Sequence, residues 1–378
     1  MDYLERSAEQ RKIIWFKVSN RYSLVELPAY EVITRLMRSV PHGEISKWCS
    51  EYYTLPPAEA RRFVDEIADS VAQQATPAAT DIAFAENENS ISFPPDFYSQ
   101  RFYKAGNIVI AVDYQCEDLE YMIHPKFAHL EIATNASRDY HFSVFMQKQD
   151  FVLSIDEQMI GRWKRDDSHY FTGKFSMELL NRMYAKTDAD WIGVFHASAI
   201  SRNDRCIMFL GISGSGKSTI AAILVAAGFG LVADDFVPLG AASVEVFSFP
   251  AAVSVKKKAV DVLSSQFPQL LDAKEYTYPG VGKTVRYLAP HITNGNIENG
   301  FPCKALVYVN YQPDSGLVVE KMPGDEAFMQ LVPDSWLSPL EANASQFLDW
   351  FLALPCYRLT YSDNEKMVVA VHELFDHE

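Results

Sequence analysis

The chain has 378 residues, of which 48% are hydrophobic and 22% are charged, and these fractions are near the average for globular proteins. This composition excludes a mostly disordered chain, a collagen-like chain and a coiled coil. Lys and Arg number 34 against 49 Asp and Glu, so the formal net charge is −15, which disfavours binding to nucleic acid or to an anionic membrane surface. At about 150 residues per domain, the length predicts two or three domains.

The segment at the N-terminus does not resemble a signal peptide, because no apolar stretch follows a basic region there. The longest apolar run, residues 220–233, is interrupted by Gly228 and Gly230 and is too short to span a bilayer. The five cysteines are scattered, and none forms a C-x-x-C pair. We therefore expect a cytoplasmic protein without disulfides, without a cysteine zinc site and without a membrane partner.

Residues 1–75 have the pattern of a small α+β domain. Two short β-prone runs, 13–18 and 22–27, flank a turn, and three helical patterns follow them. These predicted helices cover 28–40, 44–53 and 57–73. Residues 76–99 contain many Ala, Thr, Pro, Asn and Glu residues, which predicts a linker.

Two further segments differ from each other in pattern. Residues 100–189 are predicted to be rich in strands, with β-prone runs at 107–112, 142–145 and 151–155. From residue 190 to 378, strands alternate with helices, which indicates an α/β domain. Near its end we expect helices at 347–354 and 367–374 and a strand at 357–361, all serving as scaffold.

Residues 211–218 read Gly-Ile-Ser-Gly-Ser-Gly-Lys-Ser and match the phosphate-binding pattern G-x-x-x-x-G-K-[ST]. In such a loop the backbone amides surround phosphate, Lys217 reaches the terminal phosphates and Ser218 can bind Mg²⁺. A β-prone run at 205–210 precedes the loop and a helical pattern at 219–227 follows it, so phosphate would meet a helix N-terminus. The predicted nucleotide-binding residues are Gly211, Ser213, Gly214, Ser215, Gly216, Lys217, Ser218 and Thr219.

Two further features bear on catalysis. Asp234 and Asp235 end a short apolar strand pattern, and paired carboxylates beside a phosphate loop can serve the metal and the nucleophile. Adjacent strand residues face opposite sides, so the two acids would have different tasks. A solvated turn at the end of the strand is the alternative interpretation of the acid pair.

His196 lies in an apolar run, where a single histidine is more often a core residue than a catalytic one.

Together, His196, the loop at 211–218 and the triplet Ala233-Asp234-Asp235 resemble the C-terminal catalytic domain of the HPr kinase/phosphorylase family. That family has a His, a G-x-S-G-x-G-K-S loop and an A-D-D triplet in this order, and the resemblance extends over about residues 190–240. It implies an α/β P-loop kinase fold related to the nucleotide-binding part of phosphoenolpyruvate carboxykinase, with ATP and Mg²⁺ as cofactors. By the family's roles, Asp234 would be the general base on a hydroxyl, Asp235 would help Ser218 to hold Mg²⁺, and His196 would orient the acids.

The chain departs from that family downstream of the acid pair, where the family's E-I-R-G-x-G run has no counterpart. In this respect it looks more like the HPr-kinase-like proteins of biosynthetic gene clusters, which argues against HPr as the acceptor and against a phosphorolytic reverse reaction. The family also forms rings, so a homo-oligomer is compatible with the resemblance. Residues 1–75 are similar to PqqD-like domains, which bind a peptide as an added strand, and a winged-helix module is the alternative.

The transferring phosphoryl group would need one more cation. The candidates are Arg286, which can hold phosphate with two donors, and Lys256, although the run Lys256-Lys257-Lys258 also suits the solvated start of a helix. The predicted catalytic residues are Asp234, His196, Lys217 and Arg286, and the predicted metal ligands are Ser218 and Asp235.

The sequence therefore predicts an ATP- and Mg²⁺-dependent kinase that phosphorylates a serine-type hydroxyl on a peptide or a small molecule. Two alternatives remain at this point. One is a nucleotide-gated peptide-binding scaffold without catalysis, and the other is a regulatory ATPase that transfers phosphate to water.

Overall fold

The computed structural model describes residues 3–76, 93–133, 136–278, 282–289 and 300–376. The chain is mixed α/β, with several sheets, and it divides into two compact units. One unit contains residues 1–82 and 321–356, and the other contains 83–320 and 357–378. Most of the expected linker, residues 77–92, lies outside the described residues. No helix in the described ranges is long and apolar enough to cross a membrane.

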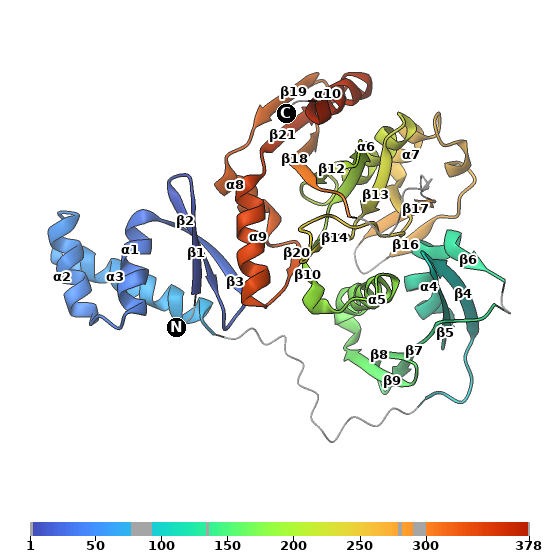
Figure 1. Ribbon diagram of the computed structural model, residues 1–378, viewed down its shortest axis with the longest axis horizontal. Helices are drawn as coiled ribbons and strands as arrows, with labels where there is room; N and C mark the ends of the chain where they lie inside the picture. Colours follow the sequence, from blue (N-terminus) through green and yellow to red (C-terminus); the bar gives the residue numbers. More distant parts are fainter. Residues whose placement is uncertain (1–2, 77–92, 134–135, 279–281, 290–299, 377–378) are drawn as a thin grey trace. The chain divides into compact units, whose positions relative to one another are not determined.

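The first unit begins with a three-stranded antiparallel sheet in the order β1-β2-β3, followed by three helices (Figure 1, blue). Their bounds are β1 Tyr3–Ala8, β2 Arg11–Phe16, β3 Arg21–Glu26, α1 Leu27–Met37, α2 His42–Tyr52 and α3 Pro57–Gln74. The sequence patterns predicted the last two strands and all three helices. They missed β1 because only its final residue, Ala8, is buried, so the strand shows no hydrophobic alternation.

Residues 321–356 belong to this same unit, whereas the sequence patterns placed them in the C-terminal domain. They form α8 Gly324–Leu331, β20 Ser335–Leu337 and α9 Glu341–Ala353. The ring of Tyr22 on β3 packs edge-on against Phe347 of α9 at 5.4 Å and against Phe328 of α8 at 6.1 Å. Arg6 on β1 forms an ion pair with Asp349 of α9 at 2.7 Å. These contacts join segments that are far apart in the sequence, so local sequence patterns could not predict them.

Replacement of Phe347 by alanine tests this assignment. The ring is fully buried among the aromatic side chains of this unit, so its loss should destabilise the protein by about 3–5 kcal/mol. Urea unfolding followed by fluorescence measures the change. Asp349→Ala, which removes a solvent-exposed ion-pair partner, should cost less than about 1 kcal/mol. Equal small effects of both substitutions would contradict the packing of α9 on the N-terminal sheet.

The second unit begins with a six-stranded sheet in the order β6-β4-β5-β7-β8-β9 (Figure 1, green). Its strands are β4 Ser99–Ala105, β5 Ile108–Tyr114, β6 Glu131–Ile132, β7 Tyr140–Gln147, β8 Asp150–Ile155 and β9 Gln158–Trp163. The strand-rich pattern of this segment is confirmed, but two helices were not expected: α4 Glu117–Phe127 and α5 Ser168–Met183. Phe171 and Phe175 of α5 pack on Phe151 and Phe142 of the sheet, with ring centroids 5.0 and 5.4 Å apart.

The remainder of the second unit contains the strand, loop and helix that the phosphate-loop motif predicted. Its main sheet has the order β13-β11-β12-β18-β21-β19, and two smaller groups of strands, β10 with β14 and β15-β17-β16, lie alongside. The strands are β10 Trp191–Phe195, β11 Ser198–Arg202, β12 Arg205–Leu210, β13 Gly230–Asp234, β14 Val237–Gly240, β15 Val253–Lys256, β16 Tyr276–Tyr278, β17 Lys283–Leu288, β18 Cys303–Tyr311, β19 Leu317–Lys321 and β21 Cys356–Tyr361. The helices are α6 Lys217–Ala226, α7 Lys257–Leu263 and α10 Asn364–Asp376. Short 3-10 turns occur at Ala128–Leu130, Arg165–Asp167, Asp188–Asp190 and Pro268–Leu270.

Helix α6 is apolar on nearly all sides because strands on two sides cover it. Ile220 and Leu224 of α6 share one core with Ile207 of the main sheet and with Val253 of the smaller β15-β17-β16 sheet. A helix that is covered on all sides needs no polar face. This packing anchors α6, and the phosphate loop leads directly into its first turn.

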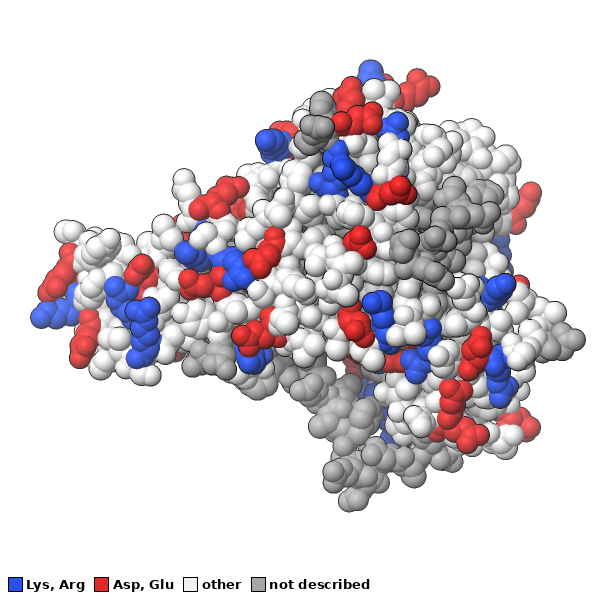
Figure 2. All heavy atoms as spheres, in the orientation of Figure 1, with Lys and Arg blue, Asp and Glu red and all other residues white. Residues whose placement is uncertain are grey.

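Charged side chains of both signs are interspersed over the face drawn in Figure 2. Although the net charge is −15, this face has neither one large basic area nor one large acidic area. Because the overall field of an acidic protein repels anions, the attraction for an anionic ligand has to come from a few local groups.

Candidate functional site

The phosphate loop joins the end of β12 to the start of α6. Its glycines Gly211, Gly214 and Gly216 have left-handed φ angles of 134°, 94° and 108°, which other residues rarely adopt. A side chain on Gly211 would also approach the carbonyl oxygen of Val309 to 3.0 Å. The conformation of the loop therefore requires glycine at these positions, as the motif predicted.

Two lysines lie at this loop. Lys217 is only 6% exposed, and its ammonium donates hydrogen bonds to the carbonyl oxygens of Gly211 at 2.6 Å and Ile212 at 3.4 Å. Lys256, at the end of β15, donates to the hydroxyl of Ser213 at 3.4 Å. The structure thus brings together Lys217, which the motif predicted, and Lys256, which the sequence offered as one of two further cations.

Arg286, the other candidate cation, is placed elsewhere. Its guanidinium donates to the carbonyl oxygens of Leu270 and Leu271 and forms an ion pair with Glu275 at 3.3 Å. These partners belong to the segment between α7 and β16 and not to the phosphate loop. Arg286 therefore holds that segment against β17, and Lys256 takes its place as the second cation near the loop.

Asp234, the last residue of β13, is 1% exposed and bonded on both carboxylate oxygens. Oδ1 accepts hydrogen bonds from the hydroxyls of Ser198 at 2.5 Å and Ser218 at 3.1 Å, and Oδ2 accepts one from the amide of Ser254 at 3.3 Å. Burial, together with the charge of Asp235, raises the pKa of Asp234 to about 7 in spite of these bonds. Ser198 is a site residue that the sequence analysis missed.

Asp235, directly after β13, has a different environment. Its side chain is 35% exposed, and its two oxygens face His196 Nδ1 at 3.7 Å and Lys283 Nζ at 3.8 Å. Burial by itself would raise the pKa of Asp235, but the charges of Lys283, His196 and Lys126 lower it below its usual value. Its carboxylate is therefore ionised at neutral pH and open to a ligand.

These environments favour the opposite assignment of roles to the two acids. A general base must come within hydrogen-bond distance of the proton that it removes, and Asp234 is sealed from any acceptor while Asp235 is accessible. Ser218 is bonded to Asp234, so the pair of oxygens suited to Mg²⁺ is Ser218 with Asp234 and not with Asp235. His196 is 38% exposed and faces Asp235, which excludes a buried core residue and suits an orienting role.

Ser218 and Asp234 fit a magnesium ion in their chemistry. Hydroxyl and carboxylate oxygens are the donors that Mg²⁺ prefers, and the two side chains approach to 3.1 Å. The described residues contain no group of three or more His, Cys, Asp and Glu side chains placed to hold a metal. Mg²⁺ sites in general often have only one or two protein ligands, with phosphate and water completing the coordination.

Lys126 on α4 also faces this site, although it lies in the strand-rich segment. The backbone carbonyl of Lys126 accepts a hydrogen bond from the amide of Ala252 at 2.8 Å, and the ring of Phe127 packs on Phe249 at 6.0 Å. The C-terminal end of α4 is thereby attached to the chain that leads into β15. No sequence pattern could have indicated Lys126, because its link to the site is purely tertiary.

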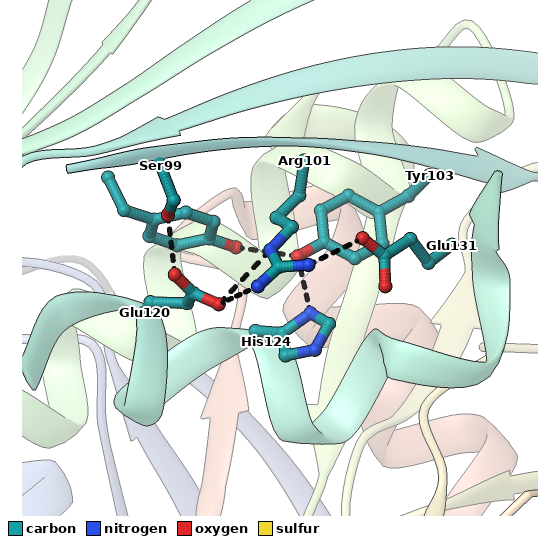
Figure 3. Close-up of polar contacts among 7 residues, drawn as sticks. Ser99, Arg101, Tyr103, Glu120, His124 and Glu131 are labelled. Atoms are coloured by element: carbon teal, nitrogen blue, oxygen red, sulfur yellow. Dashed lines mark hydrogen bonds and ion pairs between the residues drawn. The ribbon is translucent and has the colours of Figure 1, made fainter. Parts of the chain in front are cut away.

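A polar cluster fixes α4 on its own sheet (Figure 3). Arg101 on β4 binds Glu120 of α4 through two nitrogens, at 2.7 and 3.1 Å, and binds Glu131 of β6 at 2.9 Å. The hydroxyl of Tyr103 lies 2.9 Å from Nδ1 of His124. Since these groups satisfy one another, we interpret the cluster as a positioning network for α4 and for the site lysine that this helix carries.

The stability of this region should depend on pH through two histidines. Burial lowers the pKa of His124 and of His129. In the unfolded chain these histidines take up protons near pH 6.5, whereas in the folded protein they do so only at a lower pH. Their contribution to the free energy of unfolding is therefore fully present above pH 6.5 and is lost as the pH falls toward the lowered pKa values. We expect a loss of about 1.4 kcal/mol per pH unit for each histidine, measured by urea unfolding between pH 7.5 and 5.5. His129→Leu should reduce this loss by about 1.4 kcal/mol per pH unit below pH 6.5, and an unchanged pH dependence would contradict the prediction. Protonation of Asp234, whose pKa is raised, acts in the opposite direction in both proteins and cancels from this difference.

Comparison of the chain with models of known protein families and with curated proteins finds no match. The function has therefore to be inferred from the residues of the site.

Proposed function

We propose that the protein is a kinase that uses ATP and Mg²⁺ to phosphorylate a hydroxyl group of a peptide or a small molecule. One observation carries this proposal. The phosphate-loop serine, Ser218, is hydrogen-bonded to a buried acid, Asp234, and the next residue, Asp235, is an accessible acid. The residues that we propose to bind phosphate, to hold the metal and to act as the base are thus adjacent, and phosphoryl transfer needs these three kinds of group.

The positive groups of the loop would bind the phosphates of ATP. Its amides lie at the N-terminus of α6, where the helix dipole favours an anion. Lys217 would exchange its bonds to the loop carbonyls for bonds to phosphate, and Lys256 would approach the terminal phosphate from the side of Ser213. Ser218 and Asp234 would hold Mg²⁺, which when bound neutralises the charge on the phosphates.

Asp235 would act as the general base. It accepts the proton of the acceptor hydroxyl while the hydroxyl oxygen forms a bond to the γ-phosphorus, the bond from that phosphorus to the bridging oxygen breaks, and ADP leaves. The lowered pKa of Asp235 is compatible with this role, because the loose transition state of phosphoryl transfer demands little basicity. His196, 3.7 Å from the carboxylate, would orient it.

A transfer assay tests the proposal. The protein is incubated with γ-labelled ATP and Mg²⁺ together with a fractionated cell extract, and the label should appear on an organic acceptor. Two outcomes would contradict the proposal. Release of labelled phosphate at the full rate without extract indicates the regulatory ATPase, and ATP binding without any transfer indicates the non-catalytic scaffold.

The resemblance to HPr-kinase-like proteins supports the same reaction but does not name the acceptor. The resemblance of residues 1–75 to PqqD-like domains would favour a peptide, and it remains a prediction. Pull-down of a labelled precursor peptide by residues 1–82 alone would not be a fair test, because residues 321–356 complete that unit. The full chain is the proper reagent.

A further inference from the structure

Besides Lys217, three side chains that carry or can carry positive charge lie near the accessible acid. They come from three separate elements: Lys283 begins β17, His196 follows β10, and Lys126 lies on α4. Lys283 and His196 lie 3.8 and 3.7 Å from the carboxylate of Asp235, and Lys126 interacts electrostatically with both Asp235 and Lys283. Two lysines therefore interact with a single carboxylate, which can neutralise only one of them, so positive charge remains beside the proposed base.

Lys126 is the least expected of these groups. Its side chain is partly exposed, and within the described ranges its ammonium makes no hydrogen bond or ion pair. Burial lowers its pKa, the carboxylate of Asp235 opposes that shift, and the charge of Lys283 adds to it. A partly desolvated ammonium group without an acceptor is available to bind an anion, and such groups are common at ligand sites.

The two lysines assigned to ATP have partners in the phosphate loop. Lys217 is bonded inside the phosphate loop, and Lys256 contacts Ser213 of the same loop. Lys126 and Lys283 instead share the surroundings of Asp235, the residue that would contact the acceptor hydroxyl. An anionic group on the acceptor would therefore meet both lysines when its hydroxyl lies at Asp235.

We propose that the acceptor carries a carboxylate or phosphate group that binds Lys126 and Lys283 while its hydroxyl lies at Asp235. This proposal rests on the proposed kinase function and names the substrate class of the same site. It directs attention to hydroxy acids, to hydroxyl amino acids with a free carboxylate, including one at the end of a peptide, and to phosphorylated alcohols. The rival role for the two lysines is to stabilise the transferring phosphoryl group itself.

Calorimetry with three matched three-carbon alcohols tests the proposal. The full chain is saturated with Mg²⁺ and the non-hydrolysable analogue AMP-PNP, and is then titrated with glycerol, glycerate or glycerol 3-phosphate. We expect at least one of the two anions to bind and glycerol not to bind, and the anion that binds distinguishes a carboxylate site from a phosphate site. Lys126→Met and Lys283→Met should each weaken that binding about ten- to a hundredfold.

The matched control is Lys258→Met, which removes an exposed lysine at the start of α7. It should leave anion binding unchanged, and thermal unfolding should show that all three variants are folded. If neither anion binds, or if both substitutions at the site leave the affinity unchanged, the proposal is wrong.

Two further readouts separate this proposal from the kinase function. Failure of AMP-PNP to bind would overturn the proposed function, whereas AMP-PNP binding without anion binding would overturn only the anionic acceptor. The extract fraction that supplies the acceptor should be retained by an anion exchanger at pH 8 before it is labelled, and an acceptor that passes through unretained would contradict the proposal. Lys126→Met should then raise KM for the acceptor about tenfold or more, whereas a fall in kcat with unchanged KM would assign the lysine to the transferring phosphoryl group.

Discussion

Replacing Lys217 by alanine is expected to weaken ATP binding by at least about a hundredfold, because bonds from an ammonium to phosphate are charge-assisted and this group is desolvated. The ammonium already lies within the loop, 2.6 Å from the carbonyl oxygen of Gly211, so little reorganisation is needed before it meets phosphate. Titration with a fluorescent ATP analogue measures the affinity.

The control for this substitution is Lys258→Ala, which removes an exposed lysine of α7 and should leave the affinity unchanged. Because Lys217 is buried, a second variant, Lys217→Met, keeps most of the side-chain volume, and it should show the same loss if the fold is intact. Normal ATP affinity in folded Lys217→Met protein would show that the loop is not the nucleotide site.

Replacing Asp235 by asparagine should leave the affinity for ATP within a fewfold of its original value and slow phosphoryl transfer by about 10²–10⁴-fold. Asparagine keeps the shape of the side chain but cannot accept the hydroxyl proton. Single-turnover measurement with γ-labelled ATP separates this loss from any effect on binding.

Asp234→Asn is the matched comparison, because it makes the same chemical change at the adjacent residue. Asp234 is bonded to Ser218 and sealed from the acceptor, so we expect this variant to lose mainly the Mg²⁺-dependent part of ATP binding. If Asp234→Asn bound Mg²⁺ and ATP normally but failed in transfer, while Asp235→Asn transferred at the original rate, the roles would be those expected from the family resemblance.

The local sequence was sufficient to predict the phosphate loop and its surroundings. Glycines at 211, 214 and 216 permit backbone conformations that other residues rarely adopt, so the motif specifies the loop by itself. The apolar runs before and after it match β12 and α6. For the same reason, most helices of the N-terminal unit could be predicted, since proline at a first turn and regular apolar spacing are local signals.

Contacts between distant segments decided the rest. Aromatic packing on Tyr22 assigns residues 321–356 to the N-terminal unit. The guanidinium of Arg286, a predicted catalytic cation, donates hydrogen bonds to the carbonyl oxygens of Leu270 and Leu271. Neither contact can be predicted from the spacing of residues that are close in the sequence.

The roles of Asp234 and Asp235 show the same division. The sequence by itself determined that two carboxylates follow a phosphate loop, and that adjacent strand residues would face different surroundings. Only the tertiary structure decided which acid is sealed by Ser198 and Ser218 and which is exposed between cations from α4 and β17. The physical reason is that the exposure and the charge environment of a side chain depend on which distant elements pack against it. Hydrophobic periodicity indicates which side of an element is buried, but not which residues bury it.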